Sequence, residues 1–246
     1  MKTDSHLHIY DLLQLWTPEP INWDGVKRVT SMHNQKEWEH YQKHLQHSNQ
    51  IKASFGLHPQ LPVWEEKELL EKLVRQKSIV AIGECGFDFF LNHSPELDKQ
   101  QTEIFQFQLE LALDSGLPLV LHLRRATDKI FTYLKDLKNV SSVIFHSWPA
   151  PPHEAQSLLK RGVNAYFSLG PPLLQGNKKA QGCALQLPLD RILSETDAPY
   201  QTLKGEAFTT PEHLEQVLQI WSKLRGIEKK ELELNIEKNF FMVYGF

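Results

Sequence analysis

Cysteine is scarce in this chain, and long apolar segments are missing. The 246 residues include two cysteines, Cys85 and Cys183, which are too few for a disulfide framework and lack the CxxC spacing of a zinc site. No apolar run approaches bilayer length, and the first residues lack the apolar core of a signal peptide. We therefore expect a cytoplasmic protein without a membrane anchor.

An excess of positive charge is also missing. The chain has 27 Lys and Arg against 30 Asp and Glu, which gives a formal net charge of -3. Proteins that grip long duplex DNA release counterions from many phosphates and usually carry a broad basic surface. A nucleic-acid substrate would therefore have to be held locally, near an end.

The chain does contain eight short apolar runs, most of them separated by polar stretches with helical spacing. The runs lie at 2–9, 26–33, 51–59, 78–85, 117–124, 141–148, 164–171 and 191–199. Helices are expected at 37–47, 65–76, 99–114, 126–138, 153–160 and 211–225, with a last helix at 228–239 closing the bottom or side. This alternation predicts the α/β class and a single (β/α)8 TIM barrel. Such barrels commonly reach this length undivided, so residues 1–246 are expected to form one domain.

The first connection of this barrel differs from the others. It contains Pro18 and Pro20, which interrupt any helix, so it is expected to be short or irregular.

Residues of the types that bind metals stand at the carboxyl ends of five predicted strands. They are His6 and His8 in DSHLH, Glu84 in AIGECG, His122 in LVLHLR, His146 in VIFHSW and Asp197 in LSETDAP. Active sites of TIM barrels lie at this end, and alternation along a strand puts His6 and His8 on one face. Any one of these residues alone is more often structural, but six together favour a metal centre.

The mixture of imidazole and carboxylate suits Zn²⁺, Mn²⁺ or Fe²⁺ better than Mg²⁺, which prefers oxygen. Two ions fit if His6, His8 and Asp197 stand on one side, His122 and His146 on the other, and Glu84 between them. A bridging water would then become a hydroxide nucleophile, while one ion polarises a phosphoryl or carbonyl oxygen. We expect Asp197 to take the proton of that nucleophile.

Three further residues lie near this end of the predicted barrel. Glu195 precedes Asp197 by two positions on the same predicted strand face, so we expect it to support the ligands from behind. His58 in GLHP and Arg124 after His122 place a donor and a cation where an anionic substrate could bind, although a His before Pro often just ends a strand.

A second group of histidines has helical spacing. His40, His44 and His47 lie in the polar stretch WEHYQKHLQHS, which lacks the glutamate of HExxH, so we expect a solvated helix face rather than a metal site.

Taken together, the motifs resemble the TatD family of metal-dependent hydrolases and deoxyribonucleases. The likeness runs through DSHLH, GLHP, IGECGFDF, LHLRRA, IFHS and SETDAPY, and so through most of the chain. It implies two divalent ions, with Zn, Mg or Mn as candidates, held by His6, His8 and Asp197 on one ion and His122 and His146 on the other, with Glu84 bridging. It also implies hydrolysis of phosphodiester bonds in DNA, often from the 3′ end, so that DNA ends or a small phosphodiester are the expected partners.

Two segments depart from the family pattern. The family usually has HCFSG where this chain has HSWPA, with Trp148 and Pro149. After SETDAPY the usual Arg-Gly pair and the following Asn and Pro give way to QTLKGEAFTTPEHL, in which Lys204 is the candidate substitute for the arginine. Both departures fall around the expected substrate rather than around the metal ligands.

Two other functions remain open at this stage. The same activated hydroxide attacks a carbonyl carbon, so an amidohydrolase acting on a C–N or ester bond is the alternative; Glu84 argues against it, because the phosphotriesterase-like and urease-like relatives usually have a modified lysine there. A barrel without catalysis that serves as a binding protein is the other alternative, and the complete ligand set counts against it.

Overall fold

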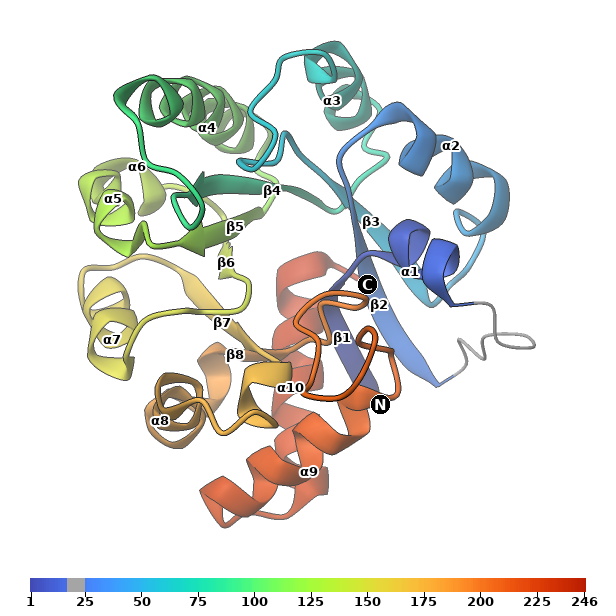
Figure 1. Cartoon of the computed structure of the whole chain (residues 1–246), viewed down its shortest axis with the longest axis vertical. Coiled ribbons are helices and arrows are strands. Elements are labelled where there is room, and N and C mark those ends of the chain that lie inside the picture. The colour runs from blue at the N-terminus through green and yellow to red at the C-terminus, as the bar shows by residue number, and fades with distance from the viewer. Residues whose placement is uncertain (17–24) are drawn as a thin grey trace.

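The protein forms a barrel of eight parallel strands surrounded by helices (Figure 1). The computed structural model describes residues 1–16 and 25–246. The strands follow one another around the sheet in chain order: β1 (Lys2–Leu7), β2 (Val26–Met32), β3 (Ile51–Phe55), β4 (Ala81–Asp88), β5 (Leu119–Arg124), β6 (Val143–Phe145), β7 (Ala165–Leu169) and β8 (Ile192–Ser194). The predicted TIM barrel is confirmed, with a strand inside or overlapping each predicted run.

Helices connect these strands along the outside of the barrel. They are α1 (Ile9–Leu15), α2 (Gln35–His44), α3 (Lys67–Arg75), α4 (Pro95–Ser115), α5 (Thr127–Thr132), α6 (Leu134–Leu137), α7 (Pro152–Lys160), α8 (Lys178–Gln186), α9 (His213–Arg225) and α10 (Lys229–Tyr244). No helix in the described part of the chain is both long and apolar enough to cross a membrane.

Three predicted connections need correction. The single helix expected at 126–138 is divided at Tyr133 into α5 and α6. Helix α8 occupies a segment for which no helix was predicted. The first connection is not wholly irregular, because it begins with α1; Pro18 and Pro20 lie outside the described residues.

Hydrogen bonds across the seam between β1 and β8 close the barrel near the site. The backbone amide of Asp197 donates to the carbonyl of His6 at 2.9 Å, and the amide of His8 donates to the carbonyl of Ala198 at 2.7 Å. The residues that follow the last strand are thereby fixed beside the first strand, which brings Asp197 next to the two histidines of DSHLH.

The opposite, amino-terminal end of the barrel is filled by α10. Phe240, Val243 and Tyr244 pack with the strand residues Val29, Ala81, Val120, Ile144, Tyr166 and Leu193. The Tyr244 hydroxyl donates to the carbonyl of Ser5 at 3.2 Å. The expectation of a closing carboxyl-terminal helix is confirmed, and access to the interior is from the other end.

Helix α4 both begins and ends at capping residues and holds two loops of the site. Ser94 accepts a hydrogen bond from the amide of Leu97, and Gly116 ends the helix in the left-handed conformation. From its buried face, Gln108 accepts from the amide of Leu57 at 2.8 Å and donates to the Leu57 carbonyl at 3.0 Å. Gln101 makes the matching pair of bonds to the backbone of Asp88. These amides fix the GLHP loop and the end of β4.

Candidate active site

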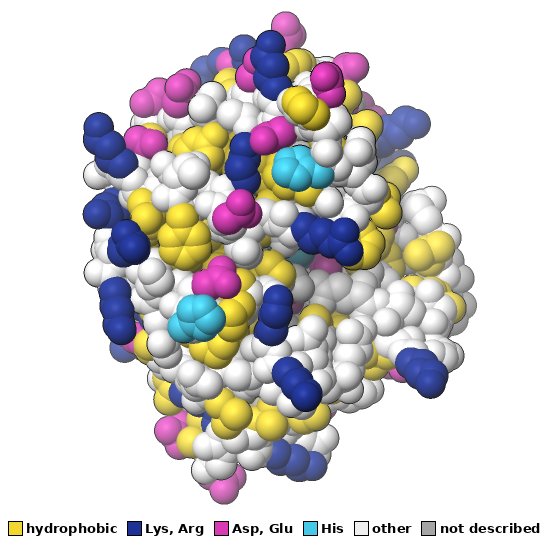
Figure 2. Space-filling model, turned by 60° about the vertical axis from the view of Figure 1, so that its left-hand side comes forward, with side chains coloured by type: hydrophobic (Ala, Val, Ile, Leu, Met, Phe, Trp, Pro, Cys, Tyr) yellow, Lys and Arg dark blue, Asp and Glu magenta, His cyan; other side chains and the backbone are white. Residues whose placement is uncertain are grey.

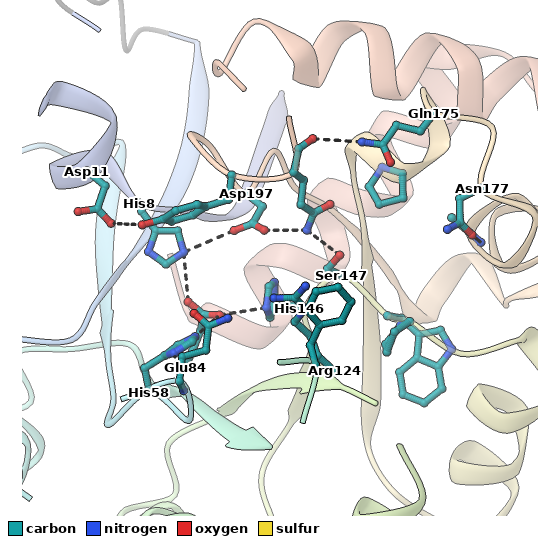
Figure 3. A pocket seen from close by; sticks show the side chains of 18 of the residues that line it. His8, Asp11, His58, Glu84, Arg124, His146, Ser147, Gln175, Asn177 and Asp197 are labelled. Atoms are coloured by element: carbon teal, nitrogen blue, oxygen red, sulfur yellow. Dashed lines mark hydrogen bonds and ion pairs between the residues drawn. The ribbon is translucent and has the colours of Figure 1, made fainter. Parts of the chain in front are cut away.

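An open cavity of about 1220 Å³ lies at the carboxyl ends of the strands (Figure 3). His8, Glu84, His146 and Asp197 line it, and all four are buried. Four groups of three residues there present ligand atoms within 4.8 Å of one another: His6, His8 and Asp197; His6, Glu84 and His146; His8, His33 and Glu84; and His58, Glu84 and His122. The structure thus brings all six predicted ligands together.

Glu84, in β4, stands at the middle of this cluster. Its Oε1 lies 3.2 Å from Nε2 of His6 and 3.1 Å from Nε2 of His8. Its Oε2 lies 3.2 Å from Nδ1 of His122 and 3.0 Å from Nε2 of His146. Each carboxylate oxygen therefore faces its own pair of predicted ligands, His6 and His8 at the end of β1 on one side and His122 and His146 at the ends of β5 and β6 on the other.

Asp197 stands on the Oε1 side. Its Oδ1 lies 3.6 Å from Nε2 of His6 and 3.4 Å from Nε2 of His8. Its Oδ2 accepts a hydrogen bond from the side-chain amide of Gln201 at 2.7 Å. Asp197 does not lie on a strand, because β8 ends at Ser194 and Asp197 has a φ of 52°. The expected strand over 191–199 is therefore too long.

Several buried atoms of this cluster lack a hydrogen bond. Within the described residues, Oε1 of Glu84, both ring nitrogens of His6 and Nε2 of His33 are buried without a hydrogen-bond partner. Leaving buried polar atoms unpaired is costly. A divalent cation would satisfy these donor atoms together, and imidazole with carboxylate is a suitable donor set for Zn²⁺ or Mn²⁺. The residues present therefore fit a metal centre.

The electrostatics of the cluster are dominated by burial and by the Glu84 charge. Burial works against ionisation of Glu84, but the surrounding imidazoles His6, His146 and His58 hold its pKa well below the usual range. Burial also opposes protonation of His8, yet the charges and hydrogen bonds of Glu84 and Asp197 raise its pKa to about 10. In the absence of a cation, the carboxylate charge is therefore balanced by a proton on an imidazole.

Carboxylates also stand behind the two histidines of the Oε2 side. Nε2 of His122 is hydrogen-bonded to Oδ2 of Asp88 at 3.0 Å, which leaves Nδ1 facing Glu84. Oε1 of Glu195 lies 3.8 Å from Nδ1 of His146, and Glu195 is fully buried. Carboxylates in such positions orient metal-binding imidazoles and increase their basicity. The sequence predicts this supporting role for Glu195. It does not predict it for Asp88, which lies in the motif IGECGFDF.

Two of the three predicted substrate-binding residues line the cavity. Nε2 of His58 lies 3.5 Å from Oε2 of Glu84, and burial lowers the pKa of His58 to about 3. The Arg124 guanidinium lies 3.9 Å from the ring centre of Phe90 and 3.6 Å from Asp88. Lys204 is exposed and is not among the residues that line the cavity.

Sequence reasoning did not select the remaining side chains around the centre. They include His33, Asp88, Ser147, Tyr200 and Gln201. His33 could have been found by the rule that selected His58, because both stand near the carboxyl end of a strand, His33 directly after β2 and His58 shortly after β3. Gln201 offered no such signal, because its place depends on a loop that returns to Asp197.

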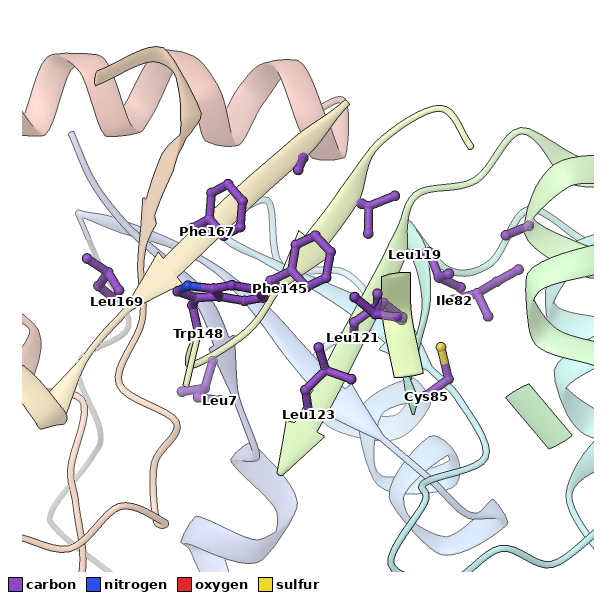
Figure 4. Close-up of a cluster of buried hydrophobic side chains, with 14 of the residues drawn as sticks. Leu7, Ile82, Cys85, Leu119, Leu121, Leu123, Phe145, Trp148, Phe167 and Leu169 are labelled. Atoms are coloured by element: carbon purple, nitrogen blue, oxygen red, sulfur yellow. The ribbon is translucent and has the colours of Figure 1, made fainter. Parts of the chain in front are cut away.

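Trp148, one of the departures from the family pattern, belongs partly to the core. It is 3% exposed, and its ring contacts Phe145 and Phe167 edge-on, with centroids 5.1 Å away from each (Figure 4). It also lines the cavity together with Pro149. The HSWPA segment therefore forms part of one wall of the cavity and packs it against the core, and it retains the predicted ligand His146.

His40, His44 and His47 lie outside the centre. His44 and His47 are exposed, and His40 is partly exposed. Among the described residues, none of these three belongs to a group that could hold a metal. The expected solvated helix face fits this placement.

This barrel, with imidazoles and carboxylates converging at the carboxyl ends of its strands, is typical of metal-dependent hydrolases. Residues 3–245 match the family model described as TatD related DNase, and the chain therefore belongs to the TatD family of metal-dependent hydrolases.

Two curated relatives and one solved structure illustrate the likeness. The chain is 31% identical over 202 residues to an uncharacterised metal-dependent hydrolase of Mycoplasma genitalium, covering 77% of this chain and 76% of that protein. It is 30% identical over 211 residues to the 3′-5′ ssDNA/RNA exonuclease TatD of Erwinia amylovora, covering 81% and 80%. The crystal structure of the TatD homologue YJJV from Escherichia coli superposes with a TM-score of 0.83 at 22% identity, covering 100% of this chain and 98% of that one, which supports the fold.

Proposed function

We propose that this protein is a dinuclear metal-dependent phosphodiesterase that removes nucleotides from the 3′ end of single-stranded nucleic acid. The observation that carries the proposal is the arrangement around Glu84, in which each carboxylate oxygen faces its own pair of predicted ligands. One buried carboxylate between two nitrogen pairs suits two neighbouring cations.

In this proposal, His6, His8 and Asp197 hold one ion, His122 and His146 hold the other, and Glu84 contacts both. Asp88 and Glu195 orient the histidines of the second group from behind. Two divalent ions in such a site supply Lewis acidity, which lowers the pKa of water and polarises a phosphoryl oxygen.

Asp197 is the proposed proton acceptor. Its Oδ1 faces the histidines, while its Oδ2 accepts a hydrogen bond from Gln201. A carboxylate with one oxygen engaged can take a proton on the other. The nearby imidazoles keep the pKa of Asp197 below its usual range against the effect of burial, so it is ionised at neutral pH.

Substrate binding is assigned to the side chains that rim the cavity. Arg124 offers a cation to a phosphate, and its guanidinium is positioned by stacking on Phe90, which is 43% exposed. His58 offers a ring nitrogen close to Glu84. The name of the Erwinia amylovora relative, a 3′-5′ ssDNA/RNA exonuclease, favours single strands as the substrate class.

The charge distribution supports a short contact with the substrate. On the face drawn in Figure 2, Lys and Arg side chains are interspersed with acidic, histidine and apolar side chains. An enzyme that follows a long duplex needs many phosphate contacts, whereas one that works at an end needs only a few.

A substrate panel tests this proposal. The protein is stripped with a chelator, reloaded with Zn²⁺, Mn²⁺ or Mg²⁺, and offered single-stranded DNA, single-stranded RNA, a small phosphodiester and an amide. We expect phosphodiester cleavage that requires the metal. Turnover of the amide alone would favour an amidohydrolase, and binding without turnover by the fully loaded protein would favour a binding protein.

A further inference from the structure

His33 lies at the floor of the cavity, just after β2, and the local sequence holds its backbone firmly. Asn34 is the N-cap of α2, and its side chain accepts a hydrogen bond from the amide of Glu37 at 3.1 Å. The Glu37 carboxylate returns to the amide of His33 at 2.6 Å. This reciprocal cap fixes the entry to the helix and so holds the backbone of His33 beside the cluster.

The ring of His33 is oriented by a backbone carbonyl. Its Nδ1 lies 3.2 Å from the carbonyl oxygen of Gly56, which can only accept a hydrogen bond. Nδ1 therefore carries the proton, and in the neutral ring Nε2 has a free lone pair. This is the usual preparation of a metal-binding imidazole, in which the second nitrogen donates to a carbonyl or carboxylate.

The free nitrogen of His33 points to the cluster. Nε2 lies 3.3 Å from Oε1 of Glu84 and is buried without a hydrogen-bond partner in the described chain. His8, His33 and Glu84 present ligand atoms within 4.8 Å of one another. The unused lone pair is thus directed at the same carboxylate oxygen that faces His8.

His58, whose ring lies edge-on to His33 with centroids 4.9 Å apart, has the opposite arrangement. Its Nδ1 accepts a hydrogen bond from the amide of Gln60 at 3.1 Å. In the neutral ring Nε2 therefore carries the proton and is a donor. Although both histidines follow strands and face Glu84, only His33 offers a lone pair to a cation.

We propose that His33 is an additional metal ligand, binding through Nε2 to the ion on the Oε1 side of Glu84. This inference rests on the proposed metal centre. It gives that ion donors from His6, His8, His33, Asp197 and Glu84, against His122, His146 and Glu84 for the other. The centre is therefore asymmetric. The ion on the His33 side is retained more tightly, while the other keeps more open positions for water and substrate.

Two substitutions separate a ligand from a structural residue. In His33→Asn, the amide can keep the bond to the Gly56 carbonyl near the position of Nδ1 but has no atom at the position of Nε2. In His33→Gln, the longer side chain can place an oxygen near Nε2. The matched control is His47→Asn, the same change at an exposed histidine beyond the end of α2.

The readouts are Co²⁺ or Zn²⁺ affinity of the stripped protein, measured by chelator competition, and the visible absorption of bound Co²⁺, which reports coordination number. We expect His33→Asn to weaken the binding of one of the two ions by at least about 10- to 100-fold, which is the usual cost of losing a residue that supports a metal ligand. The affinity for the other ion should be unchanged. The Co²⁺ spectrum should change in His33→Asn and recover in part in His33→Gln. The His47→Asn control should match the wild type.

Equal affinity and an unchanged Co²⁺ spectrum in His33→Asn would overturn the assignment of His33 while leaving the metal centre intact. Equal weakening of both ions would also overturn it, because only a general disturbance of the cluster acts on both sides. Absence of metal binding by the wild-type protein would instead overturn the proposed function itself.

Discussion

The side-chain amide of Gln201 donates to Oδ2 of Asp197 at 2.7 Å and also reaches Oγ of Ser147 at 2.6 Å. It thereby joins the loop after β8 to the loop after β6, across the mouth of the cavity. All three residues have a positive φ, at 54°, 52° and 44°, a conformation that is costly for residues other than glycine. The arrangement fixes the orientation of the Asp197 carboxylate.

Replacing Gln201 with alanine should reduce kcat without removing metal. The change keeps Asp197 beside His6 and His8 but removes the hydrogen bond to Oδ2, so the carboxylate is free to turn. By analogy with other residues that support metal ligands, we expect a loss of about 10- to 100-fold in kcat. Elemental analysis and steady-state kinetics on the same preparation measure both quantities. A proportional loss of metal and activity would mean that Gln201 is needed for metal binding and not specifically for orienting the proton acceptor Asp197.

Replacing Glu84 with alanine should weaken binding of both ions, because it removes the carboxylate between the two imidazole groups. Elemental analysis after dialysis against metal-free buffer measures the remaining content. His47→Ala, at an exposed position beyond the end of α2, is the control and should retain the wild-type content. Equal metal in the two variants would remove Glu84 from the centre.

Metal binding should release protons and should strengthen as the pH rises. In the metal-free protein Glu84 and Asp197 raise the pKa of His8 to about 10, so the imidazole is protonated at neutral pH. A cation can bind only the neutral ring, so protons compete with it at every pH below that value. Each displaced proton should improve the affinity about tenfold per pH unit in this range. Titration with Zn²⁺ in weakly buffered solution with a pH indicator tests this, and a pH-independent affinity would contradict it.

Replacing Arg124 with alanine should raise KM for oligonucleotides more than it lowers kcat. The guanidinium lies over Phe90 at the rim of the cavity, so its loss removes a phosphate contact and uncovers the ring. We expect a shallow salt dependence of the wild type, equivalent to roughly one to three phosphates, which becomes shallower in the variant. Measuring kcat/KM at several salt concentrations tests this. A salt dependence of kcat/KM equivalent to many phosphates would indicate that the protein contacts a longer stretch of the substrate backbone.

An ion-pair network far from the cavity gives a test of stability. Glu215 in α9 binds Lys2 at 2.6 Å and also Lys229 in α10, and these contacts lower its pKa below the usual 4.5. The stabilisation is fully present above pH 4.5 and disappears as the pH falls through the lowered value. Glu215→Gln should therefore reduce the free energy of unfolding by about 0.5 kcal/mol at neutral pH, in the range of partly exposed pairs.

Urea unfolding of the metal-free protein at neutral pH and at about pH 3 measures this difference, which should shrink at the lower pH. Glu71→Gln, which breaks an exposed pair with Arg75, is the control and should change stability less. A pH-independent effect of Glu215→Gln would show that packing rather than charge is responsible.

Much of the barrel and of the metal centre could be predicted from local patterns. Apolar runs of strand length recur along the chain, and the ends of parallel strands meet at one end of a barrel, so His6, Glu84 and His122 could be placed together before the structure was known. The orientation of these side chains relative to Glu84 could not be predicted, because it depends on hydrogen bonds between residues far apart in the sequence, such as Asp88 and His122.

The elements and residues that the sequence did not predict correctly can be explained locally. Helix α8 was missed because KKAQGCALQ is polar and contains Gly182; in the fold a side chain there would approach the ring of Pro152 to 3.1 Å, so packing explains the glycine. Strand β8 was extended too far because the turn to the left-handed conformation at Asp197 leaves no mark in the sequence. His33 was passed over although it stands at a strand end like His58.

The most direct test of the proposed function is digestion of a 5′-labelled single-stranded oligonucleotide by the metal-loaded protein, with a free or a chemically blocked 3′ end. We predict stepwise shortening from the free 3′ end, protection of the blocked strand, and loss of cleavage by orders of magnitude in Asp197→Asn, whose side chain cannot accept the proton. Internal cleavage of both strands, near wild-type activity of Asp197→Asn at saturating metal, or no cleavage by a fully loaded protein would contradict it.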